Sequence, residues 1–372
     1  MHAADRAWAE IDPGALQRNA RHLAGVAGGA DVFAIIKANG YGHDLLKVAQ
    51  ALDSKVDRLG VASLSEALEL EQAGIHTTPY LLGTSLPEDR DLIVELGFEP
   101  TVSSLVEAQA WSELAVRKKK TISVHYHVDT GMGRTGFPEA AWSTDLAADL
   151  AGLPAVRVEA IASHFPSADE DPAFTEDQIL RFEAAVEKAQ QGGLRPARIH
   201  LANSAGILAF PASHHDAVRP GLALYGVSPL PGHAEGKALE PTLSLKSRVL
   251  DVRSLPKGHG ISYGRSHVLL RDSDVASVGI GYGDGLPRSL GDSPDAALLI
   301  GGQRRPILGR ITMDQILVDV TGSQVRSGDE VVVIGTQGEQ AVTIREIADQ
   351  SGTIPWEILT GITPRVVRRV TK

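Results

Sequence analysis

Short apolar runs alternate with amphipathic stretches over the first 220 or so residues, and this alternation limits the fold more than any other feature. Strands separated by helices form parallel sheets, because each helical crossover returns the chain to the same edge of the sheet. Eight such units over about 190 residues favour a closed (β/α)8 barrel of the TIM type over an open doubly wound sheet. The eight runs span 32–36, 58–63, 78–83, 99–104, 122–129, 158–165, 198–203 and 215–221.

A second pattern begins after Tyr225, where Pro and Gly become frequent and strands then follow strands. We therefore expect an α/β protein with an N-terminal barrel over residues 12–230, followed by a C-terminal mostly-β domain over residues 235–372. One late helix is predicted near 343–350. Residues 5–11 form a further predicted strand, which we expect to join the β domain.

Charge and composition exclude several classes of function. The chain has 36 Lys and Arg against 46 Asp and Glu, a net charge of −10, which argues against nucleic-acid or anionic-membrane partners. It contains no Cys, so disulfides and thiolate chemistry are excluded. No apolar run is long enough for a membrane helix, and the N-terminal segment lacks the apolar core of a signal peptide. We expect a cytoplasmic protein.

The chemistry of a barrel of this kind lies where strands end and loops begin. Lys37 directly follows the first apolar run, and a desolvated lysine amine can attack a carbonyl carbon. A solvated surface lysine is the simpler interpretation of that residue alone. Tyr41 lies between Gly40 and Gly42, which indicates a tight loop that directs its phenol towards the barrel mouth.

The seventh and eighth runs end in residues suited to binding phosphate. Asn203 ends one and Ser204 follows it, and Arg219 and Gly221 end the other. Barrels commonly bind phosphate in these two loops through backbone N–H groups, although Asn-Ser before a helix is equally an ordinary N-cap. A reactive lysine facing a phosphate site suggests pyridoxal 5'-phosphate as cofactor.

A metal site is the competing interpretation. His125, His127 and Asp129 lie at alternate positions of one strand and therefore face the same side, while His164 and His200 end two further strands. Such a set could hold a hydrolytic metal. The simpler alternative, in which these histidines only satisfy hydrogen bonds in the barrel interior, is the one we favour, and it requires no metal.

Eight ordered motifs resemble the alanine racemase family, from the N-terminal segment to the final PRVVRR. The resemblance implies a barrel followed by a β domain, pyridoxal phosphate as cofactor, an amino-acid substrate and a homodimer with shared active sites. The motifs, in order, are AIIKANGYGHD, VDTGMGRTG, SHFPSAD, HLANSAG, VRPGLALYG, SYGR, GYGDG and GRITMDQ.

The resemblance also implies roles for individual residues. Lys37 would hold the cofactor and exchange a proton on one face of the substrate, and Tyr263 of the partner subunit would do so on the other. Arg219 would donate to the pyridine nitrogen, with His164 against the ring. Further cofactor contacts would come from Tyr41, Asn203, Ser204, Gly221, Leu222 and Trp356, and substrate contacts from Arg134, Tyr282, Met313 and Asp314.

Two positions depart from the family pattern. His127 stands where many members carry a lysine that becomes carbamylated and orients the arginine, and Trp356 stands where a phosphate-binding tyrosine is usual. Indole N–H can donate a hydrogen bond but cannot accept one. Racemisation of serine or lysine, a non-catalytic carrier of the cofactor and a metal-dependent hydrolase remain the alternatives to racemisation of alanine.

Overall fold

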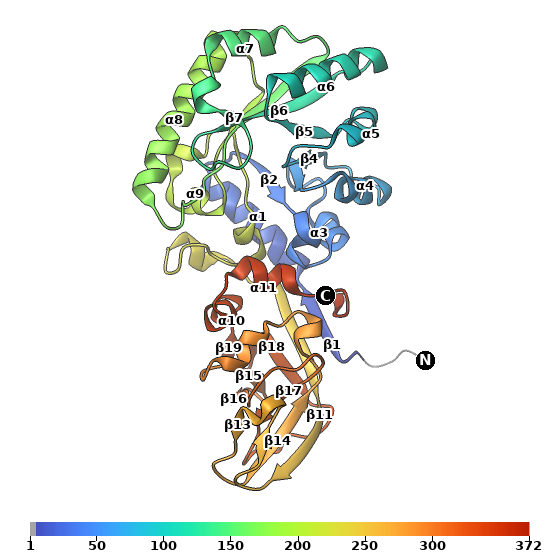
Figure 1. Cartoon of the computed structure of the whole chain (residues 1–372), viewed down its shortest axis with the longest axis vertical. Helices are drawn as coiled ribbons and strands as arrows, with labels where there is room; N and C mark the ends of the chain where they lie inside the picture. Colours follow the sequence, from blue (N-terminus) through green and yellow to red (C-terminus); the bar gives the residue numbers. More distant parts are fainter. Residues whose placement is uncertain (1–4, 372) are drawn as a thin grey trace. The chain divides into compact units, whose positions relative to one another are not determined.

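The computed structural model describes residues 5–371, which form two compact units (Figure 1). The first unit contains residues 16–40 and 45–240, and the second contains residues 5–15, 41–44 and 241–371. Lys372, the end of the predicted second domain, and the first four residues of the N-terminal segment lie outside the described residues.

The first unit is built on a closed barrel of eight parallel strands, which confirms the predicted fold class and excludes the open sheet. Strand β5 pairs with β4 on one side and with β6 on the other, and this second pairing closes the ring. The strands are β2 (Asp31–Ile35), β3 (Arg58–Val61), β4 (Pro79–Leu81), β5 (Glu99–Val102), β6 (Ile122–Asp129), β8 (Val156–Ala162), β9 (Arg198–His200) and β10 (Ala217–Val218), with the short β7 (Phe137–Pro138) beside β6.

Short polar side chains mark where several of the helices begin. Ser63, Ser104 and Ser143 each accept a hydrogen bond from a backbone N–H three residues later, which satisfies one of the free donors at a helix start. Figure 1 shows α4, α5 and α6 on the outside of the strands. The α-helices that begin between residues 5 and 240 are α1 (Pro13–Val26), α2 (Lys37–Tyr41), α3 (Leu45–Leu52), α4 (Leu64–Gln72), α5 (Arg90–Leu96), α6 (Leu105–Lys118), α7 (Thr144–Ala151), α8 (Pro172–Gln191) and α9 (Ser204–Ala209).

The second unit is mostly β, as predicted. Its long strand β11 (Leu243–Leu255) alternates buried and half-buried residues over its first half, as expected for a strand with one face on a core. That strand pairs with β1 (Ala7–Ile11), which also lies parallel to β20 (Val367–Val370). The other strands are β12 (Gly260–Ile261), β13 (His267–Val268), β14 (Ser273–Val278), β15 (Ala297–Ile300), β16 (Gln303–Pro306), β17 (Ile316–Asp319), β18 (Glu330–Gln337) and β19 (Gln340–Val342).

Two helices lie in the second unit where the sequence predicted one. Helix α10 (Ile344–Ser351) matches the predicted late helix, and α11 (Pro355–Gly361) follows it. Pro355 occupies the first turn of α11, where its missing N–H costs no hydrogen bond. The helix was missed because a seven-residue segment is too short to show helical periodicity.

Three short segments lie in a unit other than the one expected from the sequence, and the first of them, residues 12–15, belongs with the β unit. Residues 235–240 belong with the barrel, where the side chain of Asn19 bonds both the N–H and the carbonyl of Glu240. Residues 41–44 belong with the β unit, where the ring of His43 bonds the hydroxyl of Thr242 at 2.9 Å. These contacts join residues that are distant in sequence, so no local sequence pattern predicts them.

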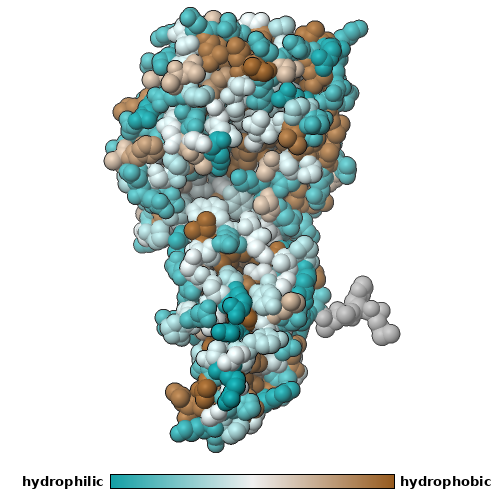
Figure 2. Space-filling model, in the orientation of Figure 1, coloured by the Kyte–Doolittle hydropathy of each residue, from teal (hydrophilic) through white to brown (hydrophobic). Residues whose placement is uncertain are grey.

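Hydrophobic residues on the face drawn in Figure 2 occur in small groups among hydrophilic ones. Among residues 5–371 no helix is both long and apolar enough to cross a membrane.

Candidate active site

The loops that follow the barrel strands bring together several of the predicted site residues. Lys37 follows β2, His164 follows β8 and Arg219 follows β10, while Arg134 lies in the loop after β6. Their charges act on one another: besides burial, Arg219, Arg134 and Lys37 all lower the pKa of His164. The structure therefore places these four side chains at one end of the barrel, as the motif positions predicted.

Lys37 is a mostly buried amine. Burial lowers its pKa, the nearby Arg134 cation lowers it further, and the carboxylate of Glu66 opposes both. Among residues 5–371 no hydrogen bond or ion pair is made by its Nζ. A lower pKa increases the neutral fraction of the amine, and the neutral amine is the nucleophile.

The segment after Lys37 is a left-handed turn. Ala38, Asn39, Gly40 and Tyr41 have φ values of 54°, 56°, 62° and 49°. Each non-glycine residue in this conformation costs about 1–2 kcal/mol. Hydrogen bonds offset part of that cost, since the Ala38 N–H donates to Glu66 at 2.7 Å and the Asn39 side chain accepts from Leu45 at 2.8 Å. Backbone strain of this kind concentrates at functional sites.

Tyr41 ends this turn and is buried. Burial raises the pKa of its phenol to about 12, so the phenol is neutral and can donate a hydrogen bond at ordinary pH.

Arg219 is a buried cation whose hydrogen-bond partners are neutral. Its Nη1 donates to the Nδ1 of His200 at 2.5 Å and to the carbonyl of the same residue at 3.0 Å. Its Nη2 donates to the carbonyls of Ser163 and Leu201 and lies 3.2 Å from the Nδ1 of His164. Burial lowers its pKa to about 10, which leaves the guanidinium charged at neutral pH.

The predicted phosphate-binding residues lie together after β9 and β10. Asn203 caps α9 by accepting from the N–H groups of Ala205 and Gly206. The hydroxyl oxygen of Ser204 accepts from the N–H of Gly221 at 3.0 Å and of Ala223 at 3.1 Å, which ties the two loops to each other. Leu222, between these two residues, is buried.

The loop that carries Arg134 is shaped by Asp129. The carboxylate of Asp129 accepts from the N–H groups of Gly131, Met132 and Gly133, at 2.8–3.1 Å. His127 is buried nearby, and burial together with Arg219 and Arg134 lowers its pKa to about 3. Its ring is therefore neutral at pH 7, so it supplies no negative charge to Arg134 in place of a carbamate.

Three histidines of the metal interpretation, His125, His164 and His200, have protein partners. The Nδ1 of His125 lies 3.0 Å from the Nε2 of His200, and its Nε2 lies 3.0 Å from Glu99, so both ring nitrogens are engaged. Asp129 is occupied with backbone N–H groups. In the part of the chain that the structure describes, no group of three or more His, Asp or Glu side chains is arranged to hold a metal ion.

Tyr263, Tyr282 and Met313 lie on exposed loops of the second unit. Tyr263, 72% exposed, lies in the turn between β12 and β13. Tyr282 and Met313 are on neighbouring loops that are tied by backbone bonds, including one from the N–H of Gly283 to the carbonyl of Met313 at 2.9 Å.

Asp314 and Trp356 have different settings in the same unit. The carboxylate of Asp314 accepts from Arg365 at 2.6 Å, and its carbonyl accepts from Arg6 at 2.5 Å. The same two arginines lie against the buried carboxylate of Asp284, so an ion cluster holds this loop. Trp356 is half-buried in α11.

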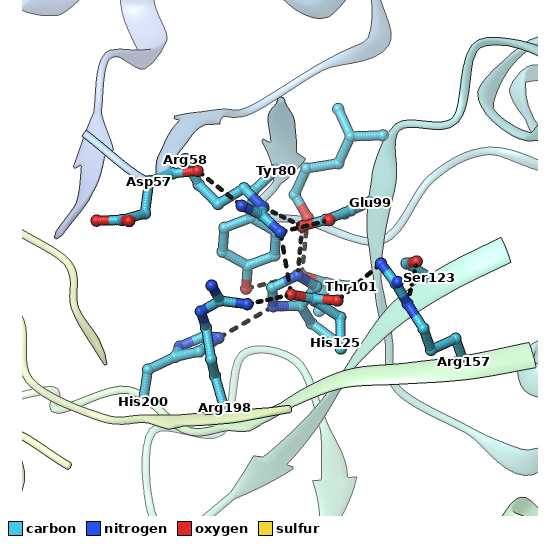
Figure 3. A network of polar contacts seen from close by, with 12 residues as sticks. Asp57, Arg58, Tyr80, Glu99, Thr101, Ser123, His125, Arg157, Arg198 and His200 are labelled. Atoms are coloured by element: carbon cyan, nitrogen blue, oxygen red, sulfur yellow. Dashed lines mark hydrogen bonds and ion pairs between the residues drawn. The ribbon is translucent and has the colours of Figure 1, made fainter. Parts of the chain in front are cut away.

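Sequence reasoning missed a group of charged residues at the starts of barrel strands. Arg58 bonds both Glu99 and Glu159, and Arg198 bonds Glu159 and Asp31. Figure 3 shows Arg58 beside Glu99. The available signal was a charged residue at the start of, or inside, an otherwise apolar run.

Known proteins resemble the chain over its whole length. Residues 11–229 match the family described as alanine racemase, N-terminal domain, and residues 242–370 match alanine racemase, C-terminal domain. The alanine racemase of Symbiobacterium thermophilum is 40% identical over 97% of this chain and 96% of its own length.

Solved structures agree with this finding. The alanine racemase of Streptomyces lavendulae has a TM-score of 0.92 and 33% identity, over 100% of this chain and 98% of its own. The Bartonella henselae enzyme, solved with covalently bound pyridoxal phosphate, has a TM-score of 0.89 and 29% identity, over 99% of this chain and 100% of its own. The chain belongs to the alanine racemase family, whose members are isomerases.

Proposed function

We propose that this chain interconverts L- and D-alanine with pyridoxal phosphate as its resident cofactor. Family membership supports racemisation of alanine, and the bound cofactor of the Bartonella henselae relative supports pyridoxal phosphate. The proposal includes a cytoplasmic location, as expected from the sequence composition, and a homodimer with shared sites, which rests on the sequence resemblance.

The observation that carries the proposal is the half-buried amine of Lys37 after a barrel strand, beside the Arg134 cation. The residues present suit the cofactor: an amine for its aldehyde, the two joined loops that carry Ser204, Gly221 and Leu222 for its phosphate, and a buried guanidinium at Arg219. We assign Tyr41, Asn203 and Trp356 to the same binding site, with His164 against the ring.

Racemisation requires a proton to leave one face of the substrate Cα and another to arrive on the opposite face. When bound, pyridoxal phosphate would supply an electron-withdrawing ring that delocalises the negative charge on Cα. Lys37 would exchange the proton on one face, and Tyr263 of the partner subunit would exchange it on the other. The lowered pKa of Lys37 suits this role, because it brings a neutral amine closer to neutral pH.

Arg134, Met313 and Asp314 would position the substrate, with Arg134 drawing the carboxylate by its charge. Tyr282 would stand at the entrance. Arg219 stays protonated, and a cation facing the pyridine nitrogen would keep that nitrogen unprotonated. This would limit side reactions such as transamination.

The direct test is to incubate the purified protein with pyridoxal phosphate, reduce it with borohydride and map the adduct by mass spectrometry. We expect the adduct on Lys37 and none in Lys37→Ala. Racemisation is then assayed with L-alanine, L-serine and L-lysine, and we expect alanine to be the best substrate. Absence of an adduct together with stoichiometric bound metal would favour the hydrolase instead, and faster turnover of serine or lysine would change the substrate assignment.

Shared sites can be tested by complementation. Lys37→Ala and Tyr263→Phe should each be inactive, but mixed dimers would hold one site with both wild-type residues. Half of randomly mixed dimers would be of this kind, so about a quarter of wild-type activity should return. If mixing restores nothing while mixed dimers form, the two residues do not come from different subunits.

A further inference from the structure

A chain of buried side chains runs from Arg219 through the barrel to the ion cluster at the strand starts. The Nδ1 of His200 accepts from Arg219 at 2.5 Å, the Nε2 of His200 lies 3.0 Å from the Nδ1 of His125, and the Nε2 of His125 lies 3.0 Å from Glu99. Arg58 bonds both carboxylate oxygens of Glu99, at 2.7 and 3.0 Å. Figure 3 shows the chain from Arg58 to His200.

The strand registers explain why these residues meet. Thr101 of β5 pairs with His125 of β6, and Glu99 lies two residues earlier on the same face of β5. His200 comes from β9. The rings have little freedom, because Tyr80 stacks on His125 with ring centroids 4.1 Å apart and Phe33 lies edge-on to His200 at 5.1 Å.

Each hydrogen bond between Glu99 and Arg219 has only one possible direction. Burial alone would raise the pKa of Glu99, but hydrogen bonds from His125 and Arg58 outweigh burial and lower it to about 2. Glu99 is therefore ionised and can only accept a hydrogen bond. The Nε2 of His125 must then carry a proton and donate it to Glu99. Burial also keeps His125 neutral.

The positions of the other ring protons follow from one hydrogen bond to the next. A neutral His125 with its proton on Nε2 has a lone pair on Nδ1, which accepts from the Nε2–H of His200. Burial and Arg219 lower the pKa of His200 as well, so that ring is neutral and its Nδ1 presents a lone pair to Arg219. The guanidinium can only donate, so this lone pair is what the contact requires.

We infer that Glu99 is a positioning residue: through His125 it fixes the tautomer of His200, and so provides the ring acceptor that holds the buried guanidinium of Arg219. The effect on the tautomers of His125 and His200 follows from these hydrogen bonds alone and does not depend on the proposed function. The effect on catalysis rests on the proposed function, in which Arg219 faces the pyridine nitrogen.

Glu99→Leu should release the tautomers, because it removes the acceptor of the His125 Nε2–H. In Glu99→Gln the amide oxygen can replace Oε2, which accepts from both Arg58 Nε at 2.7 Å and His125 Nε2 at 3.0 Å, so this variant should retain the wild-type tautomers. Once its Nε2 has no acceptor, His125 can carry its proton on Nδ1 and donate to His200, which would then turn an Nδ1–H towards Arg219. Two donors would face each other at the 2.5 Å contact. The matched control is Glu159→Gln, which removes a buried carboxylate from the same ion cluster and touches neither histidine.

The test is 15N NMR of histidine-labelled full-length protein, with and without pyridoxal phosphate, assigned with His125→Gln and His200→Gln. We expect both rings protonated on Nε2 in the wild type, in Glu159→Gln and in Glu99→Gln, and a fraction protonated on Nδ1 in Glu99→Leu. In the loaded enzyme, kcat for alanine should fall about tenfold in Glu99→Leu, the loss expected for one hydrogen bond to a charged group, with KM nearly unchanged.

A wild-type His200 protonated on Nδ1 would overturn the inference without any variant. So would unchanged tautomers in Glu99→Leu, or an equal loss of kcat in Glu159→Gln, which would indicate a merely structural role. The NMR result does not depend on turnover, so failure of the proposed function would appear as missing activity in the wild type while the tautomer assignment stood.

Discussion

The two ends of the barrel strands differ in how their charges are balanced. At the strand starts, the side chains of Arg58, Arg157 and Arg198 are paired with those of Asp31, Glu99 and Glu159. At the strand ends, Lys37, Arg134 and Arg219 make no ion pair with any side chain among residues 5–371. The nearest carboxylates, Glu66 and Asp129, are engaged with backbone N–H groups.

This difference separates stability from function within one barrel. A buried charge is tolerated when it is paired, and removing one partner leaves an uncompensated charge. The charged side chains at the strand starts balance one another and need no ligand. The ends hold three cations that an anionic phosphate and an anionic carboxylate would balance, which is what the proposed cofactor and substrate offer.

The largest expected effect is at the strand ends. Lys37→Ala should lower racemisation by about a thousandfold, the scale of a lost acid–base group, without lowering stability, because the amine makes no ion pair. Steady-state rates and thermal unfolding of the same preparations measure both quantities. Lys55→Ala, in which only an amine-to-carbonyl bond of 3.2 Å is lost, is the control and should retain full activity. A Lys37→Ala enzyme that kept most of its activity would remove Lys37 from the site.

At the strand starts the effect should be on stability. Arg58→Met would leave Glu99 and Glu159 without their shared cation and should cost about 3 kcal/mol of unfolding free energy. Arg157→Met removes a more exposed cation from the same Glu159 and should cost less than about 1 kcal/mol. Urea denaturation of both variants measures the contrast. Equal losses of unfolding free energy would show that burial does not determine how much these ion pairs stabilise the protein.

The pairing of Glu99 with Arg58 and His125 should also make the stability of the protein depend on pH in acid. The pKa of Glu99 is about 2 in the folded protein, below the value of about 4.3 for an unfolded chain. A lowered carboxyl pKa contributes stability above the unfolded pKa and loses it as the pH falls towards the folded pKa. The stability difference between wild type and Glu99→Gln should therefore be full at pH 6 and shrink between about pH 4 and pH 2. Urea midpoints across this range would measure it, and a constant difference would contradict the assigned pairing.

The sequence predicted the strand ends better than the strand starts. Each strand-end residue stood beside a glycine or after an apolar run, so a local pattern pointed to Lys37, Arg134 and Arg219. The barrel itself was predictable because strand and helix periodicities alternate regularly.

The strand starts could not be assembled from the sequence because their partners are far apart in the chain. Arg58 is 41 residues from Glu99 and 101 residues from Glu159, and only barrel closure brings them together. The tautomer chain through His125 and His200 is hidden for the same reason, since they are 75 residues apart. Their alternation with other polar residues on the strand indicated an inward face but not a direction of hydrogen bonding.

The smallest expected effect concerns the anion that the strand ends lack. His127 is neutral, with a pKa of about 3 caused by burial and by Arg219 and Arg134. In His127→Lys the same surroundings should keep the new amine neutral, and a neutral amine can add carbon dioxide to give a carbamate anion and a proton. That anion would hold Arg134, so KM for alanine should fall about two- to fivefold in bicarbonate buffer relative to carbon dioxide-free buffer, within the range of one exposed ion pair. The wild type, which has no amine at this position, should not respond. A bicarbonate response shared equally by both proteins would place the effect elsewhere, and no response in the variant would mean that Arg134 needs no anion in this chain.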